Sequence, residues 1–254
     1  MTTIQNILDF IETLAPRELK MDWDNVGLLC GSRNTPVDKI LVALDPFEHV
    51  CKEAAQLGAQ LLLTHHPLIF TAPKTVTDDT SVGRSIQLLC RHGISAINAH
   101  TNLDCAPGGV NDVLASALGL QNVETIGSEN LLRAGFVEET SLDDFLGHVK
   151  ASLGAPALRY VSGNKPVRKV AVGGGSCASS MTDALAAGCD TFVTSDIRYN
   201  QFWDAQDLHL NLIDAGHFYT ENPVIPVLAE KLQAAFPEIQ VIVSKKHADC
   251  MKFY

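Results

Sequence analysis

Two adjacent histidines, His65 and His66, directly follow the apolar run Ala59–Thr64 and precede a proline. This pattern predicts a buried strand with two imidazoles at its carboxyl end, the edge where open α/β sheets place their chemistry. Successive side chains of an extended backbone point to opposite sides, so the pair does not easily chelate one ion. Two neighbouring ions fit the pair, and so does one ion whose ligand is supported by the second histidine.

Further side chains of metal-ligand type follow other predicted strands. His100 and Asp104 are four residues apart, and His217 and Glu221 have the same spacing. On a helix this spacing places both side chains one turn apart on one face. If the last helix instead begins at the Asn-Pro pair after Glu221, as a proline in the first turn favours, His217 and Glu221 lie in the preceding turn.

Imidazole and carboxylate together suit Zn²⁺, Fe²⁺ or Mn²⁺. Two such ions, about 3.5–4 Å apart, activate a water for hydrolysis, and a bridging carboxylate can hold them together. Each of these groups also has an interpretation without a metal. His65 and His66 could be a pair in a loop, His217 and Glu221 could form a local ion pair, and Asp104 could cap a turn. Because all these residues follow strands whose ends a parallel sheet gathers at one edge, the sequence predicts a metal site.

The elements that must position these residues occur twice. Lys39–Ala43 matches Lys169–Gly173, and Leu57–His66 matches Ala187–Asp196, without gaps and at one constant offset of 130 residues. Each copy indicates strand, helix and strand, and a third strand follows in each. Strands that alternate with helices predict two similar three-layer α/β units with mainly parallel sheets, related by internal duplication. The competing explanation is that any two βαβ units look alike.

We expect the first α/β unit to comprise residues 1–125 plus about 220–254, and the second to comprise 126–219, with boundaries within about ten residues. The least regular stretch, Gln121–Glu129, places the change of unit there. Residues 239–243 predict a strand that returns to the first sheet, which makes the second unit an insertion.

Composition narrows the class of protein. The 254 residues carry a net charge of −10 without a Lys/Arg run, which argues against an open surface for nucleic acid. Seven cysteines form no C-x-x-C motif, as expected of reduced thiols. Apolar residues of the first segment share one face of a helix over 4–14, unlike a signal peptide, and no apolar run approaches the roughly 18 residues of a membrane span. We therefore expect a cytoplasmic protein without a membrane segment.

Three other segments have less defined roles. Gly173–Ser176 follows a strand and lacks the spacing of a dinucleotide or P-loop motif, so it predicts a tight turn rather than a phosphate cradle. Asp196 takes the place of His66 in the second copy, which suggests a substrate or interface role. The acidic segment Asp22–Leu28, with its tryptophan, fits either a packed connecting loop or a pocket wall.

Several motifs together resemble the NIF-three-like family, including its YbgI-like bacterial members. In chain order they are DWDNVGLLCGS, LLLTHHPLIF, NAHTNLDCAPGGVND, TSDIRYNQF and DAGHFYTE. The resemblance implies two similar α/β units with a dinuclear centre of divalent metal ions between them, and a toroidal homohexamer. The positions that match the family's metal ligands are His65, His66, Asp104, His217 and Glu221, and His100 matches a histidine of the pocket.

Proteins of this kind are often named GTP cyclohydrolase 1 type 2 homologues. The resemblance therefore implies a dinuclear-metal-dependent hydrolase in which a metal-activated water attacks a nucleotide or related small molecule. His100 is then the candidate catalytic group, because an imidazole moves protons near neutral pH. The alternative is a toroidal metal-binding adaptor or regulator without turnover. A ring that threads nucleic acid would need a basic lumen, against which the acidic composition argues.

Overall fold

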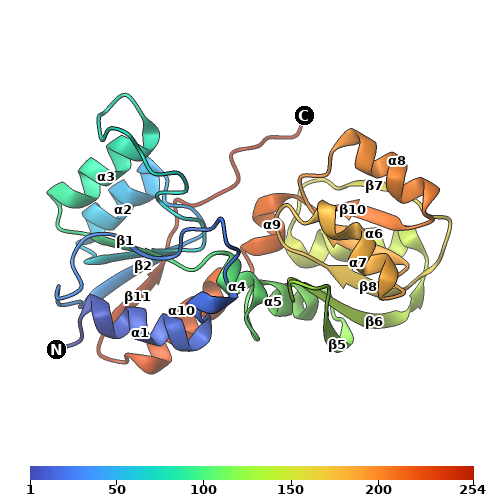
Figure 1. The fold of residues 1–254 in the computed structure, drawn as a ribbon, viewed down its shortest axis with the longest axis horizontal. Coiled ribbons are helices and arrows are strands. Elements are labelled where there is room, and N and C mark those ends of the chain that lie inside the picture. Colours follow the sequence, from blue (N-terminus) through green and yellow to red (C-terminus); the bar gives the residue numbers. More distant parts are fainter. The chain divides into compact units, whose positions relative to one another are not determined.

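The computed structural model describes residues 1–254 and divides them into two compact units. Unit 1 comprises Met1–Ala106 and Ile225–Asp249, and unit 2 comprises Pro107–Val224 and Cys250–Tyr254. Each unit has one mixed β-sheet between layers of helices (Figure 1). The chain is therefore an α/β protein with two mixed sheets. None of its helices has the length and apolar character that crossing a membrane requires.

The sheet of unit 1 has the strand order β1-β4-β3-β2-β11. Strands β2, β3, β4 and β11 run parallel, and β1 pairs antiparallel with β4. The strands are β1 (Gly27–Cys30), β2 (Lys39–Ala43), β3 (Leu61–Thr64), β4 (Ser95–Asn98) and β11 (Gln240–Val243). The helices are α1 (Ile4–Leu14), the 3-10 helix η1 (Arg17–Leu19), α2 (Glu48–Leu57), α3 (Ser81–Arg91), α4 (Thr101–Cys105) and α10 (Val224–Ala235).

Alternate side chains of the unit 1 strands enter two apolar layers. Leu41 and Leu62 pack with buried residues of α2 and α3. Ile40 and Leu63 point to the opposite face, which α1 and α10 cover (Figure 1). The helix predicted over residues 4–14 is confirmed as α1, and its apolar stripe is buried. Completely buried strands of this kind are expected where helices cover both faces of a sheet.

The sheet of unit 2 has the strand order β5-β6-β8-β9-β10-β7. Its strands are β5 (Gln121–Ile126), β6 (Leu132–Thr140), β7 (Arg159–Val161), β8 (Val167–Val172), β9 (Thr191–Thr194) and β10 (Asn211–Asp214). Its helices are α5 (Val110–Ala117), α6 (Leu142–Leu153), the 3-10 helix η2 (Ala178–Ser180), α7 (Met181–Ala186), α8 (Tyr199–Asp207) and α9 (His217–Glu221). One apolar cluster joins the sheet to α7 and α8, and another joins it to α5 and α6.

The prediction of mainly parallel sheets is wrong for unit 2. Strands β8, β9 and β10 are parallel, whereas the pairings of β5 with β6, β6 with β8, and β7 with β10 are antiparallel. The stretch Gln121–Glu129, expected to be irregular, begins with β5. Its strand residues are exposed or half-buried, so they lack the apolar alternation by which a strand is recognised in sequence.

The gapless internal match corresponds to equal strand register in the two units. Ile40 of β2 pairs with Leu61 of β3, and Val170 of β8 pairs with Thr191 of β9, each 130 residues later. In both units a third parallel strand follows, with an antiparallel edge strand beyond it. A five-residue helix comes soon after this third strand in each copy, α4 in one and α9 in the other. The repeated pattern therefore places Asp104 and the pair His217 and Glu221 on equivalent short helices.

The chain passes from unit 1 to unit 2 earlier than expected and returns to unit 1 close to the expected position, residue 220. Residues 107–125, expected in the first unit, belong to unit 2 because Leu114 of α5 packs with Val167 and Val170 of β8. After residue 224 the chain returns to unit 1, where β11 joins the first sheet as predicted. Its neighbour there is β2, with which it pairs in parallel. The helix after α4 therefore joins unit 2, and the helix after α9 joins unit 1.

Candidate metal centre

The sheet of unit 1 fixes the backbone of His65 and His66 just beyond the end of β3. The His65 amide donates to the carbonyl of Ala43 at 3.3 Å, and the His66 amide donates to the carbonyl of Leu44 at 2.9 Å. These bonds extend the β2–β3 ladder past the two strands. The position of both imidazoles is therefore set by the buried sheet rather than by a free loop.

Three imidazoles of unit 1 form one cluster. The ring centroids are 5.0 Å apart for His65 and His66, 5.2 Å for His65 and His100, and 5.5 Å for His66 and His100. Each ring offers one nitrogen within 4.8 Å of the others. Asp104 of α4 adds a carboxylate, whose Oδ1 lies 3.5 Å from Nε2 of the buried His65.

The Nδ1 atom of each clustered histidine contacts an oxygen. The pairs are His65 with the Ala99 carbonyl at 2.9 Å, His66 with Asp45 at 2.7 Å and His100 with Asp24 at 2.9 Å. A carbonyl or ionised carboxylate can only accept, so Nδ1 carries the proton and donates it. The neutral ring then has its lone pair on Nε2, which is the tautomer that a metal-ligating histidine with such a partner adopts.

The Asp24 carboxylate accepts hydrogen bonds from His100 and from two groups of Thr101. Its Oδ2 accepts from the amide of Thr101 at 3.0 Å and from the Thr101 hydroxyl at 2.5 Å. Burial alone would raise the pKa of Asp24, but the hydrogen bonds from His100 and Thr101 outweigh it and hold the pKa well below its ordinary value. Asp24 therefore stays ionised at neutral pH and accepts the hydrogen bond from Nδ1 of His100.

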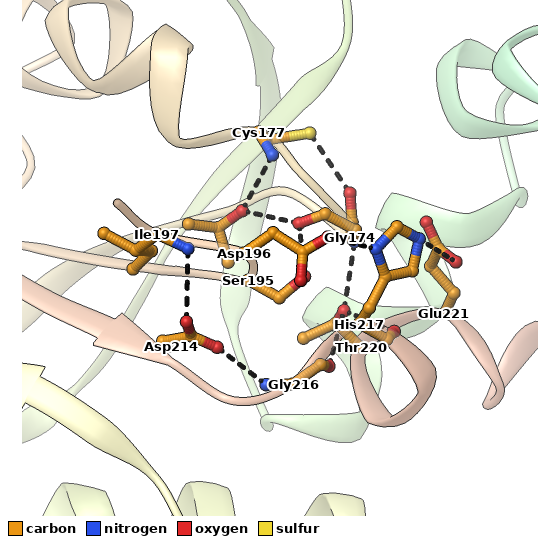
Figure 2. A network of polar contacts seen from close by, with 12 residues as sticks. Gly174, Cys177, Ser195, Asp196, Ile197, Asp214, Gly216, His217, Thr220 and Glu221 are labelled. Atoms are coloured by element: carbon orange, nitrogen blue, oxygen red, sulfur yellow. Dashed lines mark hydrogen bonds and ion pairs between the residues drawn. The ribbon is translucent and has the colours of Figure 1, made fainter. Parts of the chain in front are cut away.

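Unit 2 presents a histidine and a carboxylate on the single turn of α9. Nε2 of His217 lies 3.1 Å from Oε2 of the buried Glu221. On the other side of the ring, Nδ1 contacts Oδ2 of Asp196 at 2.7 Å (Figure 2). The same tautomer argument applies, because the Asp196 carboxylate can only accept. The alternative between one long helix and a preceding turn is resolved, since α9 is a helical turn of its own before α10.

The glycine run before Cys177 packs against this pair. A Cβ on Gly175 would lie 2.1 Å from Oε1 of Glu221 and 3.1 Å from Nε2 of His217, and the Gly175 φ of +64° also favours glycine. The Gly175 amide donates to the hydroxyl of Thr220, and the Gly174 amide donates to the side chain of Asn111. Because these amides have partners within unit 2, the segment is a tight turn and not a phosphate cradle.

Each unit, taken by itself, brings together some of the predicted residues. His65, His66, His100 and Asp104 lie together in unit 1, and His217 and Glu221 lie together in unit 2. Sequence reasoning did not identify Asp24 and Asp45 as partners of the rings, and it gave Asp196, the partner of His217, a substrate or interface role. Asp45 had the clearest signal, because it follows the buried β2 strand by two residues at its carboxyl end.

The donor chemistry fits a divalent transition metal. Neutral imidazoles with Nδ1 held by oxygen, next to carboxylates from Asp104 and Glu221, match the mixed nitrogen and oxygen sets that Zn²⁺, Fe²⁺ and Mn²⁺ accept. The hydrogen bonds at Nδ1 fix the orientation of each ring and leave Nε2 as the ligand atom. These His, Asp and Glu clusters can therefore bind metal ions.

The fold and these clusters define a class: an α/β protein with two mixed sheets and candidate metal-binding groups at the carboxyl ends of its parallel strands. The family model described as Duf34/NIF3 (NGG1p interacting factor 3) matches residues 2–250, and the chain belongs to this family. The resemblance found in the sequence motifs is therefore confirmed.

Known proteins similar to this chain cover nearly its whole length. It is 38% identical to the GTP cyclohydrolase 1 type 2 homolog of Clostridium perfringens, over 98% of this chain and 99% of the relative. It is 31% identical to the GTP cyclohydrolase 1 type 2 of Helicobacter pylori, over 92% of this chain and 93% of the relative. The crystal structure of a Bacillus cereus protein related to NIF3 superposes with a TM-score of 0.94 at 27% identity, covering 100% of this chain and 99% of that one.

Proposed function

We propose that this protein is a dinuclear-metal-dependent hydrolase of the GTP cyclohydrolase type 2-like class. Its substrate would be a nucleotide or a related small molecule with a ring that water opens. The names of the relatives from Clostridium perfringens and Helicobacter pylori support this class. The donor chemistry of both clusters supports the metal requirement.

The main support for the proposal is that four histidines, three in unit 1 and one in unit 2, have an oxygen partner at the same ring nitrogen. His65, His66, His100 and His217 each have Nδ1 against a carbonyl or carboxylate oxygen. A structural histidine needs no particular tautomer, whereas a ligand or a proton carrier requires its lone pair on a defined nitrogen. Because all four rings have the same hydrogen bond at Nδ1, a chemical role is favoured. The alternatives were a histidine pair in a loop, a carboxylate that caps a turn and a local ion pair.

The residues would divide the work as follows. Two divalent ions would be held by His65, His66, Asp104, His217 and Glu221. When bound, such ions activate a water and stabilise the charge that develops on the attacked ring. Asp104 lies on α4 and the pair His217 and Glu221 lies on α9, each a five-residue helix after the third parallel strand of its unit, which supports an origin by internal duplication.

His100 would move the proton in this reaction. Its Nδ1 proton is committed to Asp24, so Nε2 is the atom that can accept a proton from water and return it to the leaving nitrogen. Asp24 stabilises the imidazolium that forms in between, because it remains ionised near neutral pH. An imidazole exchanges protons efficiently at that pH.

The test combines metal analysis with a turnover screen. Protein purified without chelators should contain about two equivalents of divalent metal, and it should release product from GTP or another nucleotide in a panel. His66→Ala should abolish both properties, whereas His49→Ala, at an exposed histidine of α2, should abolish neither. Full metal occupancy with no turnover across the panel would contradict the hydrolase and favour the adaptor interpretation.

We further propose that the chain assembles into the toroidal homohexamer that the resemblance implies. An exposed aromatic pair on α8 supports an interface: Tyr199 is 78% exposed, Trp203 is 54% exposed, and their ring centroids are 6.4 Å apart. Native mass measurement should give six chains, and Trp203→Glu should give smaller species if α8 lies in the interface. A single-chain mass for the unaltered protein would contradict the hexamer.

A further inference from the structure

Two large exposed aromatic side chains flank the histidine cluster of unit 1. Trp23 is 62% exposed and Phe70 is 57% exposed. Their ring centroids are 5.7 Å apart, and the His100 ring lies 6.2 Å from Trp23 and 6.4 Å from Phe70. The three rings form a corner, which we call the aromatic corner. One side of this corner is the imidazole proposed to move the proton.

Hydrogen bonds hold both segments that carry the exposed rings. Directly after the tryptophan, the buried Asp24 carboxylate accepts from the amide and the hydroxyl of Thr101. Asn25 then donates from its side chain to the carbonyl of Ile69 at 2.7 Å, next to the phenylalanine. Hydrogen bonds of neighbouring residues therefore hold the backbone at Trp23 and Phe70, while the two aromatic side chains remain exposed.

The exposure of Trp23 distinguishes the two interpretations of residues 22–28, a packed connecting loop and a pocket wall. In a packed connecting loop the tryptophan would be the residue to bury, since a large aromatic ring gains about 1.5–3 kcal/mol or more from burial. Instead, the carboxylate next to it is buried and the indole is exposed. The exposed indole beside the histidine cluster favours the pocket-wall interpretation.

We propose that Trp23 and Phe70 bind a planar heteroaromatic ring of the substrate and hold it beside His100. A conjugated ring gains stacking energy on an indole or phenyl face, whereas a phosphate group has no flat face to stack. The aromatic corner thus selects a substrate with a nucleobase-like ring and brings that ring to Nε2 of His100. This inference rests on the proposed function and adds the substrate class together with the residues that recognise it.

Binding without turnover tests the inference. Only two tryptophans occur in the chain, so Trp203→Phe leaves Trp23 as the sole indole reporter. In this background and in the presence of a chelator, guanosine should quench the fluorescence, and ribose 5-phosphate should not. Phe70→Leu should weaken guanosine binding about tenfold, as expected for the loss of one stacking face, whereas Phe70→Tyr should retain it.

Calorimetry on the otherwise unaltered chain tests the tryptophan itself. Trp23→Leu should weaken guanosine binding about tenfold or more, and Trp23→Phe should retain most of it. Equal quenching by ribose 5-phosphate, or guanosine binding that Phe70→Leu leaves unchanged, would overturn the inference. Shielding of Trp23 from acrylamide in solution would also overturn it, because a protein surface would then cover the aromatic corner.

The outcome separates this inference from the hydrolase proposal. A chain that binds guanosine through the two rings but never turns over a nucleotide would contradict the hydrolase and support the aromatic corner. A metal-dependent hydrolase whose substrate affinity is the same with Trp23→Leu and Phe70→Leu would support the hydrolase and overturn the aromatic corner.

Discussion

Substitution of Gly175 by alanine should weaken metal binding while leaving the fold intact. The added Cβ would lie 2.1 Å from Oε1 of Glu221, far closer than two such atoms can approach. The nearest atom is the end of a side chain, so the carboxylate can move away from His217 without a shift of the backbone. The proposed ligand pair on α9 would then lose its geometry.

The energetic effect has two parts. An alanine at the Gly175 φ of +64° costs about 1–2 kcal/mol relative to glycine. Displacement of the buried Glu221 carboxylate adds about 1–3 kcal/mol. Metal affinity should fall at least 10- to 100-fold, the loss that removal of a supporting partner alone usually causes.

A matched control isolates the contact with Glu221. Gly154 has the same φ of +64°, and nothing lies within 4 Å of its added Cβ. Gly154→Ala should therefore show only the backbone cost of about 1–2 kcal/mol and retain its metal. Urea denaturation of chelated protein measures stability, and titration with Mn²⁺ or Zn²⁺ measures affinity. Wild-type metal affinity in Gly175→Ala would refute the assignment of Glu221 as a ligand.

Three further outcomes are expected. Asp196→Asn should weaken metal binding about 10- to 100-fold in a Zn²⁺ titration without changing the far-UV spectrum, because the Asp196 carboxylate orients His217; unchanged affinity would contradict that role. Asp24→Asn should destabilise the protein by about 2 kcal/mol at pH 7, since it removes a charged hydrogen-bond acceptor. The lowered pKa of Asp24 makes this contribution complete above the ordinary value of 3.8 and lost as the pH falls below it, so the two denaturation curves should converge in acid. Chelation should remove turnover without unfolding, measured by circular dichroism, because buried strands already position the rings; unfolding on chelation would show that the ions hold the fold.

The strands that carry the site were predictable because they are apolar and repeat. Leu57–His66 and Ala187–Asp196 matched without gaps, and the same residues pair in the same register. The candidate ligands were found because their side-chain types stand immediately after those strands. Local pattern is sufficient for such features, since a buried parallel strand must be apolar along its whole length.

The remaining features depend on contacts between residues far apart in sequence. Nothing near Asp24 in the chain indicates that it would hold the ring of His100, because their bond joins residues 76 positions apart. The edge strand β5 is mostly exposed and carries no apolar alternation, so it was taken as irregular. The helix α5 belongs to unit 2 because its apolar face packs on the sheet of that unit. The sequence of an amphipathic helix shows that it has an apolar face, but not which sheet covers that face.

Unit 1 is built from two separate parts of the chain, and this determines the order in which the two units can fold during synthesis. The outer edge of β2 receives its neighbour β11 only when residues 240–243 have emerged, some two hundred positions later. Every strand of unit 2 lies between these two, so the half that begins the polypeptide is finished last. Until then an unpaired, apolar strand edge persists on the nascent chain, which is the kind of surface that invites wrong pairing and engages chaperones.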